Sequence, residues 1–313
     1  ALEDPPEGLM AFRELGLYAE DSPFNLPIDP DAEVDPDSDE YIERLAQAAP
    51  LVLNLRHYST TVFFADADTP RYRVALPCGV AWELGVEALR EVPIPAWARP
   101  ASDDPDEATP RGCGEESGQD NHLVVLDLDS RCEYDLWQAR REDGGWAASF
   151  GNAIGMDSSG VYPRGLSTRG SGMAILGGHV WPDELSSGRI EHALVFAYPF
   201  TRAGGPVAPA TDSDGEVDLE DALPEGALVR LDPDLDLALL ALSGAELTIA
   251  RALQEYGMYL VDNGGESGIG LYIVDPRSAS TNPYAETLPD VDYPELSGIP
   301  LDRLQVMELA PQD

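Results

Sequence analysis

Four residues of this chain have side chains suited to acid–base chemistry and lie on or beside predicted strands. They are His122, Asp135, His192 and Asp262. Two imidazoles and two carboxylates can act as general acids and bases, or as ligands for one divalent ion. Convergence requires that all four point to one sheet face, which the sequence does not settle. The alternative is structural: such a histidine bonds a neighbouring loop, and an Asp before Asn-Gly is a turn residue.

Hydrolysis of a glycosidic bond needs two carboxylates about 5 to 9.5 Å apart. We expect Asp135 and Asp262 to form that pair, with His122 and His192 orienting them or exchanging protons. Aromatic side chains that stack on sugar rings when exposed, or fill the core when buried, are also present. They are Trp137, Trp146, Trp181 and Tyr162. One hypothesis is therefore a glycan-active enzyme of the hydrolase or lyase type.

A candidate cation site lies in the acidic loop around Gly215. Its carboxylates are two residues apart and belong to Asp212, Asp214, Glu216 and Asp218. This spacing resembles the oxygen-rich loops that bind calcium, although an EF-hand would require a glutamate where Leu223 stands. We expect Ca²⁺ as the candidate cofactor. The alternative is a solvated loop, because alternating acids arise by chance in so acidic a chain.

The charge of the chain limits its partners. Asp and Glu number 58 against 19 basic residues, none of them lysine, and the formal net charge is -39. Such a field repels nucleic acid, anionic lipid and acidic polymers. No apolar run approaches the roughly 18 residues that span a membrane. We therefore expect a salt-adapted protein without nucleic-acid binding or membrane insertion, whose partner is a neutral glycan or another copy of itself.

Export and one disulfide are further expectations. The chain begins at Ala1 rather than Met, which fits removal of a secretion signal, with a trimmed sequence as the alternative. We expect a secreted, extracellular protein. Cys113 and Cys132 flank a candidate strand at a separation that a disulfide can close, which leaves Cys78 buried or free. Three cysteines without CxxC spacing do not form a zinc site.

The elements that must position these residues are predominantly short strands bounded by Gly and Pro turns. We expect strands at 51–55, 60–64, 72–76, 122–128, 133–139, 146–154, 190–198, 227–231, 258–261 and 269–274. The two strands at 122–128 and 133–139 form a predicted hairpin. Helices are expected at 41–48 and 246–256. This pattern predicts an all-β fold with one or two short helices, similar to a β-sandwich or jelly roll.

The predicted organisation is one domain with an N-terminal arm. Residues 1–40 are rich in Pro, Asp and Glu and are expected to form an acidic extended arm. Residues 41–313 form the predicted β-sandwich domain. Within it, the Pro- and acid-rich segment 93–120 is a long loop, and loops of that length are often functional.

Several segments, taken in order, resemble a known family. They are Ser22-Pro23-Phe24-Asn25, Asn121-His122-Leu123-Val124-Val125, Tyr134-Asp135-Leu136-Trp137, His192-Ala193-Leu194, Tyr256-Gly257-Met258 and Asp262-Asn263-Gly264. Over nearly the whole chain, the order and spacing of these segments resemble those in a family of secreted bacterial β-sandwich proteins of largely undefined function. The resemblance implies the fold and export, and brings no settled reaction with it.

The departures from that family bear on function. Its members carry a Gly-Trp-Thr-Ser-Ala-Asp segment where this chain has Gly-Leu-Ser-Thr-Arg-Gly at 165–170, and a Trp-Pro-Ala-x-His segment where 207–212 stand. The missing Trp, Asp and His favour a non-enzymatic protein. Our first hypothesis is therefore an extracellular or cell-surface binding or structural protein stabilised by calcium, and the glycan-active enzyme is the alternative.

Overall fold

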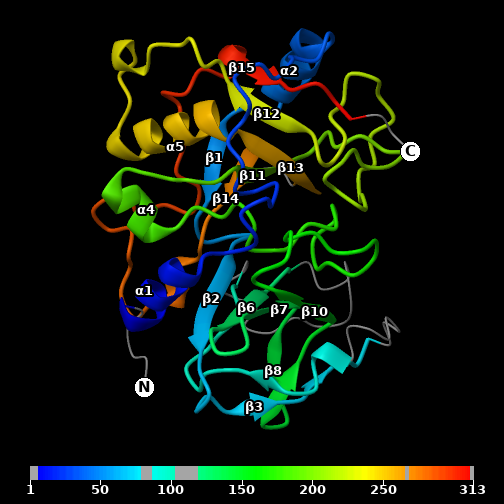
Figure 1. The fold of residues 1–313 in the computed structure, drawn as a ribbon, viewed down its shortest axis with the longest axis vertical. Helices are drawn as coiled ribbons and strands as arrows, with labels where there is room; N and C mark the ends of the chain where they lie inside the picture. The colour runs from blue at the N-terminus through cyan, green and yellow to red at the C-terminus, as the bar shows by residue number, and fades with distance from the viewer. Residues whose placement is uncertain (1–5, 79–86, 103–118, 265–267, 311–313) are drawn as a thin grey trace.

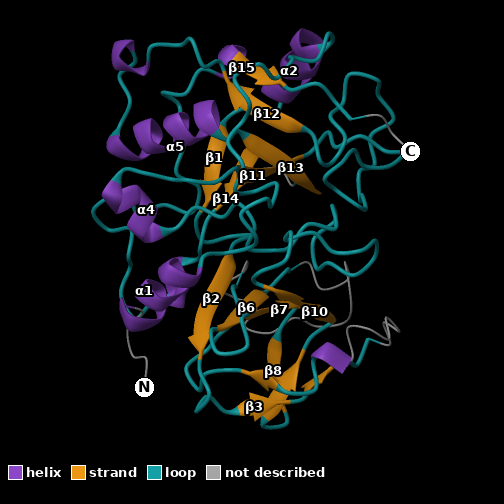
Figure 2. Ribbon diagram, in the orientation of Figure 1, coloured by secondary structure: helices purple, strands orange, loops and turns teal. Residues whose placement is uncertain are grey.

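The computed structural model describes residues 6–78, 87–102, 119–264 and 268–310 (Figure 1). Its elements are mostly strands in several sheets, which confirms the all-β prediction (Figure 2). The α-helices among the described elements are α1 (Pro6–Leu15), α2 (Ser38–Ala46), α4 (Pro182–Ser187) and α5 (Gly244–Glu255). Short 3₁₀ turns are η2 (Leu237–Leu239), η3 (Pro276–Ser278) and η4 (Leu301–Arg303).

The larger sheet has six strands in the order β1-β14-β11-β13-β12-β15. The bounds are β1 (Leu51–Asn54), β11 (Leu194–Tyr198), β12 (Leu228–Leu231), β13 (Met258–Asn263), β14 (Ile269–Tyr272) and β15 (Leu304–Val306). The sheet is mixed: β1 pairs with β14 and β11 with β13 in parallel, whereas β11 and β14 are antiparallel. Its strands are apolar and largely buried, as expected where both faces are covered.

The second sheet has four strands in the order β10-β7-β6-β2, and lies below the first in Figure 1. The bounds are β2 (Thr60–Ala65), β6 (His122–Asp127), β7 (Cys132–Trp137) and β10 (Phe150–Gly155). The antiparallel pairing of β6 with β7 confirms the predicted hairpin. Strands β2 and β6 pair in parallel, with Thr60 opposite His122.

Small ladders complete the lower part of the molecule. Strand β3 (Arg71–Tyr72) pairs with β5 (Val92–Pro93), and β4 (Val74–Ala75), β9 (Gly145–Ala147) and β8 (Arg140–Glu142) form a three-stranded sheet. The two main sheets are connected where the chain continues beyond β14. There Val274 bridges to Thr60, and the Asp275 amide donates to the Thr60 carbonyl at 2.9 Å.

The N-terminal segment differs from its prediction. It contains a helix, α1, which the expected extended arm did not include. Phe12 and Phe24 are both only 1% exposed, so this segment contributes to the core. The apolar residues of α1 recur at helical spacing, but the Pro- and acid-rich composition around them obscured the pattern.

The predicted helices at 41–48 and 246–256 are confirmed as α2 and α5. A capping box begins α5, because the Ser243 hydroxyl accepts from the Glu246 amide and the Glu246 carboxylate accepts from the Ser243 amide. Gly257, with φ of 74°, follows the helix in the left-handed conformation that commonly ends one.

The cysteine prediction is wrong. Cys132 is a free thiol, so the expected Cys113–Cys132 disulfide does not form, and Cys78 is the disulfide-bonded cysteine among the described residues. Cys113 and most of the predicted loop 93–120 lie outside the described residues. Within the described chain, no helix combines the length and apolar character required to cross a membrane.

Candidate functional site

A pocket of about 470 Å³ lies between the two main sheets. The larger sheet contributes residues near strand ends, including Asn54 of β1 and Asp262 of β13, and the smaller sheet contributes His122 at the start of β6 and Trp137 at the end of β7. We call it the inter-sheet pocket. It brings together two of the four predicted acid–base residues, His122 and Asp262.

An acidic cluster forms one wall of the inter-sheet pocket. Asp214, Glu225 and Asp262 each offer a carboxylate oxygen, and these three atoms lie within 4.8 Å of one another. Asp214 is exposed, Asp262 is half-buried, and Glu225 is fully buried behind them. Three carboxylates this close repel one another unless a proton or a cation lies between them. The acidic cluster could therefore hold a metal ion.

Neighbouring groups hold the acidic cluster in place. Glu225 Oε2 accepts from the Asp214 amide at 3.2 Å, and Asp214 Oδ1 accepts from the Asn263 amide at 3.1 Å. A Cβ at Gly170 would lie 2.5 Å from the Asp214 Cγ, so a larger residue there would displace the Asp214 carboxylate. The other oxygen of Glu225, Oε1, is buried and has no hydrogen-bond partner. An orphaned buried carboxylate oxygen calls for an explanation, and cation binding supplies one.

Burial controls protonation in this wall. It raises the pKa of Glu225 to about 10, with the charges of Asp214 and Asp262 adding to the effect. Burial also raises the pKa of Asp262 well above its usual range, and Asp214 adds to this, whereas Arg169 and the Tyr272 hydroxyl, which donates at 3.1 Å, oppose it. Without a cation, Glu225 is therefore protonated at neutral pH.

A further carboxylate, Asp120, lines the same pocket and was not predicted. Its Oδ1 accepts from the indole Nε1 of Trp137 at 2.9 Å, which fixes the ring at the pocket wall. Burial raises the pKa of Asp120 despite this bond, and the charge of Asp214 adds to the rise. The carboxylates that line the pocket are thus Asp120, Asp214 and Asp262, rather than the expected pair of Asp135 with Asp262.

Among the predicted stacking residues, Trp137 alone lines the inter-sheet pocket. Trp146 and Tyr162 are core residues, 2% and 3% exposed. Trp181 lines a different pocket. Tyr58, which was not predicted, adds a second aromatic ring that is 41% exposed. The rings of Tyr58 and Trp137 are partly exposed, and the side-chain amide of Asn54 also lines the pocket. These groups suit a polyhydroxylated ligand.

The backbone around the pocket is unusual. Six non-glycine residues of the described chain have positive φ, and three of these border the pocket: Tyr58 lines it, Asn121 lies between Asp120 and His122, and Gln138 follows Trp137. Such conformations cost about 1–3 kcal/mol each and cluster at functional sites. The backbone strain is therefore a second indication, independent of charge, that the inter-sheet pocket is a functional site.

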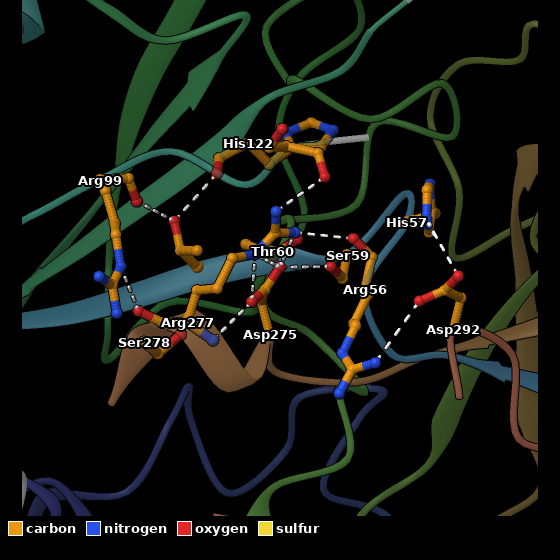
Figure 3. A network of polar contacts seen from close by, with 12 residues as sticks. Arg56, His57, Ser59, Thr60, Arg99, His122, Asp275, Arg277, Ser278 and Asp292 are labelled. Carbon is orange, nitrogen blue, oxygen red and sulfur yellow. Dashed lines mark hydrogen bonds and ion pairs between the residues drawn. The ribbon is translucent and has the colours of Figure 1, made fainter. Parts of the chain in front are cut away.

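A buried ion-paired network supports one side of the pocket (Figure 3). The fully buried Asp275 accepts from the Ser59 hydroxyl at 2.7 Å and pairs with the Arg277 guanidinium. Arg277 also donates to the carbonyls of Arg56 and Ser102, at 2.7 and 2.8 Å. The network therefore fixes the segment carrying Tyr58, between Arg56 and Ser59, against Asp275 and Arg277, which follow β14 in the chain.

The start of β6 is fixed in the same region. The Thr61 hydroxyl donates to the carbonyls of Arg99 and His122, at 2.8 and 3.1 Å, and the Ala101 amide donates to the same His122 carbonyl at 2.9 Å. These contacts hold His122 at the pocket.

Asp135 does not reach this pocket, which corrects the prediction of one four-residue site. It is fully buried on β7, where its Oδ2 accepts from the Tyr162 hydroxyl at 2.9 Å. Glu133, two residues earlier on the same sheet face, accepts from the Tyr18 hydroxyl at 2.6 Å and the Leu176 amide at 3.1 Å. Burial, followed by the charge of Glu133, raises the pKa of Asp135 well above its usual range. We call Glu133 and Asp135 the buried dyad.

His192 is also apart from the inter-sheet pocket. It lines a second pocket, of about 430 Å³, together with Arg13 and Glu184. Its Nε2 lies 3.2 Å from Glu184 Oε1, and its Nδ1 lies 3.0 Å from the Ala193 carbonyl. Burial lowers the pKa of His192, but the Glu184 carboxylate and the Ala193 carbonyl offset this, and the net pKa is raised.

The predicted loop of carboxylates at 212–218 does not converge. Within the described residues, Asp214 alone of the four belongs to a group that could hold a metal. Asp212 is paired with Arg164 at 3.1 Å, and Glu216 and Asp218 are exposed. The partners of Asp214 come instead from residues 11 and 48 positions later in the chain. Alternation along the loop was therefore the wrong signal, because residues two apart in an extended segment share a side but are spaced roughly 7 Å apart along it, too far to gather around one ion.

Comparisons of this chain with protein-family models, with curated proteins and with solved structures give no match. The family resemblance described from the sequence therefore stays a prediction. The functional argument rests on the geometry of the inter-sheet pocket.

Proposed function

We propose that this protein is an extracellular, salt-adapted binding protein that takes a neutral glycan into the inter-sheet pocket, with Ca²⁺ at the acidic cluster. The observation that carries the proposal is the convergence in one pocket of three clustered carboxylates, two partly exposed aromatic rings and amide side chains. Aromatic surface combined with convergent polar groups in one pocket is typical of sites for small molecules.

The charge of the protein favours a neutral ligand. With a net charge of -39, the surface repels uronates, sulfated sugars and phosphates. The half-buried ring of Trp137, held by Asp120, offers a face on which the apolar side of a sugar ring can stack. Asn54 can exchange hydrogen bonds with hydroxyl groups, because Gly270 leaves room for its side chain.

Calcium fits the acidic cluster better than a proton alone. All its ligand atoms are oxygens, which hard cations prefer, and calcium sites of extracellular modules have dissociation constants of about 10⁻⁴–10⁻³ M. Such a cation also relieves the repulsion among Asp214, Glu225 and Asp262. In this proposal calcium is a stabilising component of the folded protein.

Binding tests the proposal directly. The chelated protein is titrated with CaCl₂ at fixed ionic strength and screened against an array of neutral glycans. We expect about 2.7 kcal/mol of stabilisation when calcium is a hundredfold above its dissociation constant, and glycan binding that Trp137→Ala abolishes. If no calcium effect appears beyond that of NaCl, the cation part is refuted; if no neutral glycan binds, the ligand part is refuted.

Hydrolysis of the bound glycan is the second candidate function, and one specific observation favours it. Asp120 and Asp262 face the same pocket, and burial raises the pKa of both carboxyl groups, as a general acid requires. Neutral nitrophenyl glycosides incubated with the protein test this. If Asp120→Asn abolishes turnover while binding persists, the protein is an enzyme; if the unmodified protein shows no turnover, it is a binding protein.

A further inference from the structure

The acidic cluster supplies its oxygens from one side only. Glu225 lies behind the pocket wall and is 0% exposed, whereas Asp214 and Asp262 both line the inter-sheet pocket. Calcium–oxygen distances are about 2.3–2.6 Å, so oxygens on opposite sides of one ion are separated by roughly 5 Å. The three ligand atoms all lie within 4.8 Å of one another, which is below this separation and therefore permits a single ion at the wall.

The coordination that the described side chains offer is incomplete. Calcium takes about six to eight oxygen ligands, and the cluster contains three carboxylates. The Tyr272 hydroxyl is already directed to Asp262, and the Asp214 and Asn263 amides are donors. The remaining positions of the ion face the pocket, where Asp214 is exposed.

A second observation, independent of the clustering, points to an ion. Glu225 Oε1 has no hydrogen-bond partner although its side chain is fully buried beside Asp214. A buried carboxylate oxygen without a donor is rare in folded proteins, and a cation satisfies it.

We propose that the ion at Asp214, Glu225 and Asp262 binds the ligand directly, by coordinating two adjacent hydroxyl groups of a neutral sugar that enters the inter-sheet pocket. This inference rests on the proposed function and adds that calcium is part of the recognition surface. Hydroxyl oxygens are neutral ligands that complete the coordination of an ion already held by three carboxylates. Trp137, on the opposite sheet, packs against the ring of the same sugar.

Coordination of the sugar by the ion also predicts which neutral sugars bind. A sugar with two adjacent hydroxyls in the correct orientation displaces two waters from the ion, whereas its epimer at either carbon does not. Selectivity therefore depends on hydroxyl stereochemistry and on calcium together.

The number of waters on the bound ion tests the proposal before the natural glycan is identified. Eu³⁺, a luminescent substitute for Ca²⁺, is bound to the chelated protein, and the lifetime of its luminescence is compared in H₂O and D₂O. We expect at least two coordinated waters, and the loss of two when a neutral methyl glycoside from a panel of epimers binds. A site with no coordinated water would overturn the proposal, even if calcium still stabilises the protein.

Matched variants separate this inference from the proposed function. Gly170→Ala places a Cβ against the Asp214 carboxylate, and we expect at least a tenfold loss of both Eu³⁺ and glycoside affinity. Asp212→Asn, in the same loop but outside the cluster, should leave both unchanged. If chelation leaves glycoside affinity unchanged, ion coordination is refuted while the glycan pocket stands. If neither Ca²⁺ nor Eu³⁺ binds, this inference and the calcium part of the proposed function both fail.

Discussion

Two carboxylate clusters of this molecule contain the same residue types and differ in access. The buried dyad, Glu133 and Asp135, is sealed in the core, where two tyrosine hydroxyls and one backbone amide donate to it. The acidic cluster opens onto a pocket. Each cluster keeps one buried oxygen without a hydrogen-bond partner, Asp135 Oδ1 in the dyad and Glu225 Oε1 in the acidic cluster, so access is the difference between them. Burial raises carboxyl pKa values in both. The comparison indicates that burial forces each cluster to take up a positive species. In our proposal, access to the pocket lets the acidic cluster exchange its proton for a cation, which the sealed dyad cannot do.

The largest expected effect on stability comes from a substitution that disrupts the buried dyad. Both oxygens of Glu133 accept hydrogen bonds, from Tyr18 and Leu176, so Glu133→Gln must leave one buried polar group unsatisfied. We expect a loss of about 1–3 kcal/mol in the free energy of unfolding. Urea denaturation at pH 7 measures it.

Two substitutions serve as controls for that experiment. Asp135→Asn keeps a donor toward Glu133 and an acceptor for Tyr162, and should cost less than about 1 kcal/mol. Glu225→Gln in the acidic cluster should change stability little without calcium, because the carboxyl is already protonated there. Equal losses for all three variants would show that the two clusters do not differ in the way described.

The next prediction concerns the pH dependence of stability and of calcium affinity. It distinguishes a proton from a cation as the positive species bound by the acidic cluster. The folded-state pKa of Glu225, about 10, lies above its unfolded value. Without calcium, the folded protein therefore holds an extra proton, and its stability falls as pH rises between about 4.5 and 10. Calcium must displace this proton, so its affinity should rise with pH by up to about tenfold per unit for each proton released.

Calorimetric titration with Ca²⁺ at several pH values, in buffers of different ionisation enthalpy, counts the protons released. Glu225→Gln should bind calcium more weakly and with a smaller pH dependence. An affinity that is independent of pH from 6 to 9 would mean that calcium does not displace the Glu225 proton.

The sequence allowed several of these features to be predicted. Strand alternation and turn residues identified the β6–β7 hairpin and the all-β class, because these signals are local. His122 and Asp262 were grouped because strand-borne side chains on one sheet face can converge, and the structure places both of them at the inter-sheet pocket.

The remaining site residues depend on contacts that no local pattern encodes. Glu225 joins the cluster through packing of distant segments, and Asp120 through a bond to Trp137. The side on which Asp135 points was not determined by sequence, because both faces of this strand carry apolar residues. The presence of Glu133 two residues before Asp135 was a usable signal, since residues at that spacing share a face.

The smallest expected effect on stability comes from His192. In the second pocket, the imidazole of His192 is the positive partner of the Glu184 carboxylate. Glu184 Oε1 and the Ala193 carbonyl both face ring nitrogens as acceptors, and only the doubly protonated ring satisfies both. Because its folded-state pKa is raised, His192 contributes stability that is fully present below about pH 6.5 and is lost as pH rises through the folded value. We expect this contribution to be no more than about 1 kcal/mol.

NMR titration of the imidazole signals, with His192→Gln for assignment and His57→Gln as the control, measures that pKa. His57 is partly exposed beside Asp292 and makes no comparable pair of contacts. Calcium should leave the His192 titration unchanged, because the Glu184 carboxylate already has Arg13 and His192 as its positive partners. A His192 pKa at or below 6.5 would contradict the imidazolium assignment. A calcium-dependent shift would show instead that the two pockets are coupled, and the contrast between a sealed and an open site would no longer describe this protein.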